Sequence, residues 1–359
     1  MKLLVMIFGL LSLFLVSWFI LQNTTTTPIV TAQNEKLTSK PTIQQIPKRH
    51  IISQKNHVSQ TFNNCGPASL SMLLSYQNID ASQDIIGQKL RPYQNPIGDN
   101  DDKSVSMEEL AEESKNYNLL AYHRPHGSLP LLKTLITNNI PILVRTWLQP
   151  NEDIGHFRIV RGYDDETKEI IQDDSYEGGN LRQQYDIFEE IWQPFNYEYM
   201  IVVKHDQKKL VEELLSSDAD PQQAWRNAYK TAIKEAAEKP QNPYPIFNQS
   251  RALFHLSKYS QAQKAYESIQ NNLPRRMLWY QIEPIETYLQ MGYYEKVFTL
   301  TDSILSNENR GFSELYLLRG EAYKKQGNIE AARQEIKQAI YYNKNFKAAQ
   351  DALQKLENL

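Results

Sequence analysis

Apolar and polar positions change their pattern several times along the chain. Residues 3–21 are apolar and uncharged, and the polar stretch after them has little periodicity. Short helical periods and then alternating strands follow, and the last part shows helical periods alone. We therefore predict a signal peptide or membrane anchor (1–22), a disordered linker (23–49), an α+β domain (50–206) and an all-α repeat region (207–359).

The N-terminal apolar run allows two interpretations. It follows Met1-Lys2, and its length lies between that of a signal peptide and that of a membrane-spanning helix. Val30-Thr31-Ala32 offers a small-residue cleavage site, some distance beyond the run. Either interpretation predicts that the remaining chain is exported, whether secreted, periplasmic or anchored to the membrane. Cleavage and anchoring stay open.

Helical periods open the α+β domain. Ser106 and Glu109 have the spacing of a capping box, in which each side chain bonds the other residue's backbone N–H. Four acidic residues follow at this helix start: Glu108, Glu109, Glu112 and Glu113. We interpret them as a solvated surface near the positive end of the helix dipole and not as a metal cluster. We predict a loop over 91–102. Helices are predicted from Cys65 to Tyr76, from Ser82 to Leu90, from Ser106 to Ser114 and from Ser128 to Asn138.

Alternating β-type patterns close the domain. Asp164 to Thr167 is predicted as a tight turn between the second and third strands, and Ser175 to Asn180 as a loop after the third. The four predicted strands are Pro141–Trp147, His156–Tyr163, Glu169–Asp174 and Tyr199–Val203. Helices first and an antiparallel sheet second define the α+β class.

Cys65 is the single cysteine of the chain, so no internal disulfide and no Cys-based zinc site is expected. It lies on a Gly-Pro step that opens a helical pattern. A helix N-terminus favours thiolate over thiol, and Gln60, five residues earlier, is within reach to donate a hydrogen bond to an oxyanion. The alternative is that Cys65 is a small buried apolar residue.

His156 and Asp174 supply the partners that a nucleophilic thiol needs. His156 begins the second strand and Asp174 ends the third. Antiparallel neighbours joined by a short turn bring these two ends together. A base that activates the thiol, and an acceptor that orients this base, are the remaining parts of a catalytic triad. Asp173 is a rival for the acceptor, although successive strand residues face opposite sides.

Three motifs together resemble family 39 of the cysteine peptidases, a branch with the papain-like fold whose best-known members remove leader peptides from bacteriocins. The motifs are Gln60–Ser69, Gly155–Asp164 and Asp174–Tyr176, and the likeness extends over about 50–205. A fourth stretch, Tyr185–Val203, resembles the end of the members that are not part of a transporter. The resemblance implies Cys65 as nucleophile, His156 as base, Asp174 as the carboxylate that orients His156, and Gln60 as oxyanion donor. Ser175 replaces the Pro that the family usually has there, which leaves Asp173 open as a substitute.

The C-terminal region repeats with a period of 35 residues. The period relates Leu253, Tyr288 and Tyr323, and also Ser257, Gly292 and Gly327. We interpret the small residues as points of close helix approach and the aromatic ones as inter-helix core. The last unit resembles the tetratricopeptide repeat, while Pro284 intrudes into the first helix of the middle unit. A concave face for a peptide or protein partner and a scaffolding role are both open.

Net charge excludes some partners. The formal charge is -3 and the pI about 6.2, so neither nucleic acid nor an anionic membrane surface is an expected partner. No metal or cofactor is required. The sequence therefore predicts an exported cysteine peptidase that uses an acyl-enzyme and binds a partner or substrate through its repeats. Two alternatives stay open: a catalytically silent binding protein, and an amidase or acyl transferase with the same triad.

Overall fold

The computed structural model describes residues 45–93, 105–306 and 309–358. Residues from Pro41 to Leu359 cluster as one compact unit. The predicted signal peptide or anchor, most of the linker and most of the predicted loop over 91–102 lie outside the described residues. Among the helices that are described, none combines the length and apolar character that crossing a membrane requires.

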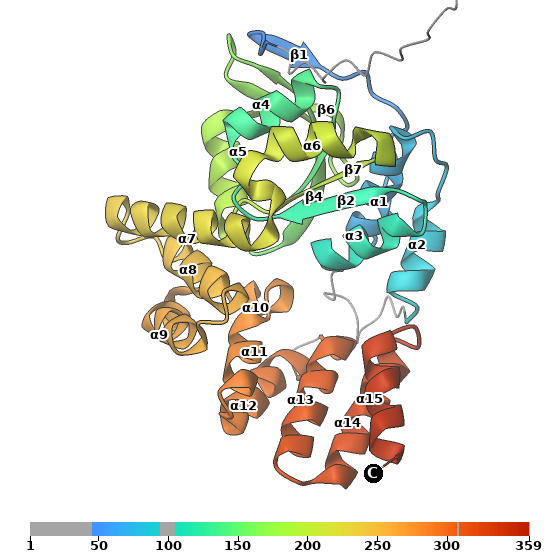
Figure 1. Ribbon diagram of the computed structural model, residues 1–359, viewed down its shortest axis with the longest axis vertical. Coiled ribbons are helices and arrows are strands. Elements are labelled where there is room, and N and C mark those ends of the chain that lie inside the picture. Colours follow the sequence, from blue (N-terminus) through green and yellow to red (C-terminus); the bar gives the residue numbers. More distant parts are fainter. Residues whose placement is uncertain (1–44, 94–104, 307–308, 359) are drawn as a thin grey trace, which may run out of the picture. The chain divides into compact units, whose positions relative to one another are not determined.

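An antiparallel sheet forms the centre of the first region (Figure 1). Within the described residues it has seven strands in the order β2-β7-β3-β4-β5-β6, and β1 pairs with the far end of β4. The strands are β1 (Arg49–Ile51), β2 (Leu120–Arg124), β3 (Ile142–Trp147), β4 (Gly155–Asp164), β5 (Glu169–Asp174), β6 (Gly178–Gln184) and β7 (Tyr199–Val203). The predicted α+β class is confirmed.

Helices cover both faces of this sheet. One apolar core joins α1 (Cys65–Ser75), α2 (Gln83–Leu90) and α3 (Met107–Lys115) to one face. A second core joins α4 (Leu129–Thr137), α5 (Tyr185–Trp192) and α6 (Lys208–Leu215) to the other. The capping box of Ser106 and Glu109 is present, and Ser82 and Ser128 cap their helices. These polar caps explain why the predicted starts were accurate.

The sheet is larger than the four strands that the sequence predicts. β1 has only three residues, β2 ends in polar residues, and β6 reads Gly-Gly-Asn-Leu-Arg-Gln-Gln on an edge where no side is fully buried. The predicted loop over 175–180 was too long, because pairing with β5 resumes at Gly178. α5 was also missed. Weak alternation at edges and ends left these elements without a clear apolar period.

The predicted solvated start of α3 is wrong for one of its glutamates. Glu108 and Glu112 are exposed, but Glu113 is only 5% exposed and accepts a hydrogen bond from Lys89. This ion pair, in which only the glutamate is buried, joins α3 to the end of α2. Glu113 therefore belongs to the packing of the domain and not to its solvated surface.

The second region is all-helical, as predicted. Along the whole described chain, 3₁₀ turns flank β7 (η1, Gln193–Phe195, and η2, His205–Gln207), follow α6 (η3, Ser216–Ala219) and follow α9 (η4, Gln270–Asn272). The helices are α7 (Pro221–Glu238), α8 (Tyr244–His255), α9 (Tyr259–Ile269), α10 (Met277–Tyr280), α11 (Glu283–Gln290), α12 (Tyr294–Leu305), α13 (Ser313–Lys325), α14 (Ile329–Tyr342) and α15 (Lys347–Glu357). Consecutive helices pack as hairpins, which is the arrangement of a helical repeat.

Two details of the predicted repeat need correction. Pro284 does not interrupt a helix, because it occupies the first turn of α11, where a missing N–H costs nothing. Ser257, Gly292 and Gly327 are small for a conformational reason: their φ angles are 58°, 76° and 82°, in the left-handed region that ends each first helix. Close helix approach instead occurs at Gly320, where an added Cβ would lie 2.6 Å from Ile336.

The two regions share an apolar core. Trp147 and Phe195 of the first region pack in one cluster with residues of α8 to α13. Leu214 and Leu215 of α6 pack against the sheet, although the predicted boundary at 206/207 precedes this helix. Packing therefore associates α6 with the first region.

Candidate active site

Cys65 is the first residue of α1. Gly66 and Pro67 follow it, and an added Cβ at Gly66 would lie 2.2 Å from Val105, so the helix start is packed too closely for a larger residue. The hydroxyl of Ser69, one turn further, donates to the backbone oxygen of Phe157 on β4 at 3.3 Å. The helix start is thereby held against the strand that carries His156.

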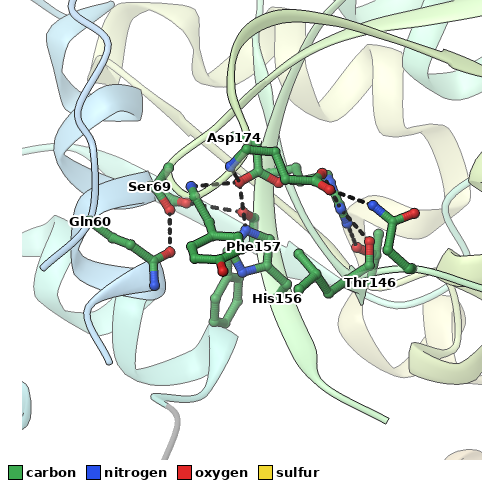
Figure 2. A network of polar contacts seen from close by, with 12 residues as sticks. Gln60, Ser69, Thr146, His156, Phe157 and Asp174 are labelled. Atoms are coloured by element: carbon green, nitrogen blue, oxygen red, sulfur yellow. Dashed lines mark hydrogen bonds and ion pairs between the residues drawn. The ribbon is translucent and has the colours of Figure 1, made fainter. Parts of the chain in front are cut away.

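His156 lies between Cys65 and Asp174. Its Nε2 is 2.8 Å from Oδ1 of Asp174. Its hydrogen bonding and charge lower the pKa of the Cys65 thiol, so the ring lies next to that thiol as well. Figure 2 shows His156 and Asp174 within one polar network, with Gln60 on one side and Thr146 on the other. Since Nε2 is used by the carboxylate, Nδ1 is the ring atom left for the thiol. The expectation that the two strand ends meet is met.

Asp174 is held by more than the histidine. Its Oδ1 accepts from the backbone N–H groups of Tyr176 at 2.7 Å and Glu177 at 2.9 Å, and Oδ2 lies 3.0 Å from Nε of Arg158. Burial alone would raise the pKa of the carboxyl. The hydrogen bond and charge of His156, helped by Arg158, prevail and lower its pKa to about 2. Asp174 is thus an anion across the physiological range.

Asp173 faces a different set of groups. Its carboxylate accepts from Nε of Arg161 at 2.7 Å, from the amide of Gln54 at 2.8 Å and from the backbone N–H of Asn180 at 2.8 Å. It points to the opposite side of β5 from Asp174, as strand alternation requires. In this structure the carboxylate bonded to His156 is therefore that of Asp174.

The protonation states of Cys65 and His156 depend on each other. Burial lowers the pKa of His156, but hydrogen bonds to Asp174 and Cys65 outweigh it and raise the pKa to about 9. Burial raises the pKa of Cys65, yet the hydrogen bond and charge of His156, with the charges of Arg91 and Arg145, leave this pKa below its usual value. A thiolate beside an imidazolium is the favoured state.

Gln60 lies beside the end of β5. Its backbone N–H donates to the oxygen of Ser175 at 2.8 Å, and the Ser175 hydroxyl donates to the side-chain Oε1 of Gln60 at 2.9 Å. The carbonyl end of the Gln60 amide is thereby fixed, which leaves its NH₂ end as the free donor. Ser175, which departs from the family pattern, has a positioning contact that a proline could not make.

Three residues near Cys65 escaped the sequence reasoning. Arg91 is buried and donates to the backbone oxygen of Asn63 at 2.7 Å, and Arg145 donates to the backbone oxygen of Tyr280 at 3.2 Å. The ring of Tyr280 lies against Gly155, where an added Cβ would be 3.0 Å from it. A charged residue in the apolar strand Ile142–Trp147 was the available signal for Arg145. Nothing in the repeat pattern marks Tyr280.

No group of three or more ligating side chains suited to a metal ion occurs in the part of the chain that the structure describes. The residues brought together at the site are Cys65, His156, Asp174 and Gln60, with two buried arginines beside them.

Comparison with known proteins assigns the first region to a family. Residues 47–200 match the model of the Peptidase_C39 like family. These residues form a C39-like peptidase domain, and the helical region that follows is similar to tetratricopeptide-repeat proteins, as the sequence predicts. No curated protein matches the chain.

Three solved structures illustrate the two likenesses. A C39-like peptidase from Bacillus anthracis is 16% identical with a TM-score of 0.38, covering 44% of this chain and 98% of its own. A double glycine motif protease of an AMS/PCAT transporter, solved with its leader peptide, is 14% identical with a TM-score of 0.32, covering 43% and 93%. A thermophilic tetratricopeptide-repeat protein of Thermus thermophilus is 20% identical with a TM-score of 0.32, covering 38% and 74%.

Proposed function

We propose that the protein is a cysteine peptidase that hydrolyses peptide bonds through Cys65, His156 and Asp174. One observation carries this proposal: Nε2 of His156 lies 2.8 Å from the Asp174 carboxylate, and the same imidazole lowers the pKa of the Cys65 thiol. A buried structural cysteine needs no base beside it and no carboxylate that orients such a base. The family match of residues 47–200 supports the same class of reaction.

The reaction follows from the arrangement. The Cys65 thiolate attacks the carbonyl carbon of the substrate, and the carbonyl electrons move to oxygen. The helix-start N–H of Cys65, which has no intrahelical acceptor, and the amide of Gln60 would donate to this oxyanion. The imidazolium of His156 then gives its proton to the leaving amine as the C–N bond breaks. A water deprotonated by His156 finally hydrolyses the thioester.

The alternatives differ at defined steps. A silent binding protein would have no reason to lower the pKa of its cysteine, whereas the pKa of Cys65 is lowered by His156 and by two arginines. An acyl transferase would use the same acyl-enzyme but replace water by an amine acceptor. We propose hydrolysis because it needs no further substrate. Export, which we infer from residues 1–22 of the sequence, completes the proposal.

Thiol reactivity tests the proposal before a substrate is known. We expect iodoacetamide to alkylate Cys65 faster than a free thiol at pH 6, and His156→Ala to remove this advantage, because the thiolate loses its counter-ion. Mass spectrometry of the full chain over time measures both rates.

The matched control is His205→Ala, since His205 is an exposed histidine on η2. It should leave the alkylation rate unchanged. If Cys65 of the natural chain is alkylated no faster than a free thiol, the enzyme proposal is wrong. The alternative of a catalytically silent binding protein would then be favoured.

A further inference from the structure

A large cavity borders the candidate active site. Its volume is about 700 Å³. From the first region α2, α3, β2 and β3 line it, and from the second α7, α8, α10, α11, α13 and α15. Arg145 and Tyr280 belong to both places: they line the cavity, Tyr280 lies against Gly155, and the charge of Arg145 acts on Cys65. A ligand in this cavity would contact the same two residues that neighbour the site.

The cavity lining is strongly acidic. Among the described residues, three Lys or Arg side chains contribute to it. Two of these already have partners, because Lys89 pairs with Glu113 at 2.7 Å and Arg251 pairs with Glu283 at 2.5 Å. Lining glutamates are Glu108, Glu109, Glu112, Glu113, Glu198, Glu283, Glu286 and Glu314. The excess of negative charge gives the cavity a preference for cations.

Several buried polar atoms of the lining have no partner. Glu198 is 6% exposed and Glu283 is 8% exposed, yet Oε2 of each accepts no hydrogen bond among the described residues. Arg145 is 2% exposed, and its Nε and Nη2 likewise have no acceptor there. Unsatisfied buried groups are costly, so a bound molecule that donates to the carboxylates and accepts from the guanidinium would be stabilising.

Two carboxyl groups of the lining, one from each region, also interact unfavourably. Glu108 on α3 and Glu286 on α11 interact electrostatically, and within the described ranges neither forms an ion pair. Burial, together with the charges of Glu283 and Glu108, raises the pKa of Glu286 to about 8. A cation between the two carboxyl groups would replace this repulsion by attraction.

We propose that the cavity binds a Lys- or Arg-bearing segment of the peptide substrate, with one cationic head group between Glu108 and Glu286. This inference rests on the proposed peptidase function. A basic peptide offers both kinds of group that the orphaned atoms lack: N–H donors for the carboxylates and backbone carbonyls for Arg145. Trp225 and Trp279 also line the cavity and give the aliphatic stem of a Lys or Arg side chain apolar surface to pack against. The repeat region thus selects the substrate that Cys65 cleaves.

Binding to the full chain carrying Cys65→Ala tests the inference without turnover. The probes are two fluorescently labelled peptides of equal length, one rich in Lys and one with Gln at every Lys position. We expect the Lys peptide to bind at least about tenfold more tightly, and the double change Glu108→Gln with Glu286→Gln to remove about tenfold of its affinity. Fluorescence anisotropy measures each Kd.

The control variant is the double change Glu213→Gln with Glu357→Gln, at exposed positions of α6 and α15. It should leave both affinities unchanged. Because Glu286 lies among other carboxyl groups, its change to Gln should not lower the melting temperature, so weaker binding would not reflect unfolding. Equal affinity for the two peptides, or equal losses in the control and cavity variants, would overturn the inference.

A second measurement separates this inference from the proposed function. In the natural chain, the bound Lys peptide should slow the alkylation of Cys65 by iodoacetamide. Lys-selective binding without this protection would assign the cavity to another cationic occupant and overturn the substrate assignment. Slow alkylation that never exceeds a free thiol would overturn the peptidase proposal, whatever the peptides do.

Discussion

The central sheet and the last repeat helices are stabilised by different kinds of interior. The sheet buries ionised groups, since His156, Arg158, Arg161, Asp173 and Asp174 are all at most 3% exposed. The core of α13 to α15 instead contains small and aliphatic residues, such as Ala332, Ile336 and Ala339. Buried charge requires a fixed set of partners, whereas an apolar core requires volume and period. The buried charges of the sheet can therefore form a reactive site, whereas the apolar core of the helices can recur from one repeat unit to the next.

The largest predicted effect concerns the buried charges of the sheet and is expected at Asp174. We expect Asp174→Ala to slow Cys65 alkylation by about a hundredfold near neutral pH, because the imidazolium loses its carboxylate partner and each pKa unit is worth a factor of ten. Alkylation kinetics followed by mass spectrometry measure this loss.

Two further variants test whether the loss of rate depends on which of the two neighbouring carboxylates is changed. Asp174→Asn keeps an acceptor oxygen and should recover part of the rate. Asp173→Ala should leave the rate near its natural value but lower the melting temperature, because Arg161 would be left buried and unpaired. Equal rates for Asp173→Ala and Asp174→Ala would contradict the distinct roles of the two carboxylates.

A smaller effect should appear in the pH profile of peptide hydrolysis. The raised pKa of His156, about 9, means that the imidazolium persists through neutral pH and is lost as the pH rises through 9. Because the proposed leaving amine takes its proton from this imidazolium, we expect kcat/KM to fall about tenfold for each pH unit above that value. A rate that keeps rising beyond pH 10 would contradict the ion pair.

The smallest effect concerns the repeat core. Gly320→Val should lower the free energy of unfolding by about 1–3 kcal/mol, since the new side chain meets Ile336 and the backbone oxygen of Ala332. Urea denaturation measures the loss. Gln338→Val, at an exposed position of α14, controls for the helix propensity of valine. Equal losses in the two variants would show that Gly320 is not limited by space.

The same contrast explains what the sequence could predict. The period of 35 residues predicted the hairpins of the repeat, and the Cys65 and His156 motifs predicted a site because their chemistry restricts residue type. β6 was missed because an exposed edge strand does not require an apolar period. Tyr280 was missed because its contact with Gly155 joins two regions far apart in the chain, and no local pattern records such a contact. Ser175 replaces the Pro that the family usually has, and the sequence does not reveal that its hydroxyl donates to Gln60.

The contact between Tyr280 and Gly155 has an evolutionary consequence. An added methyl group at position 155 would meet the Tyr280 ring at 3.0 Å, so a larger residue there would require a smaller one at position 280. The two positions should therefore change together among relatives that carry both regions. Relatives without the repeat helices should be released from this constraint and accept other small residues before the histidine. Inheritance of the peptidase domain and of the repeats would then be linked through this pair.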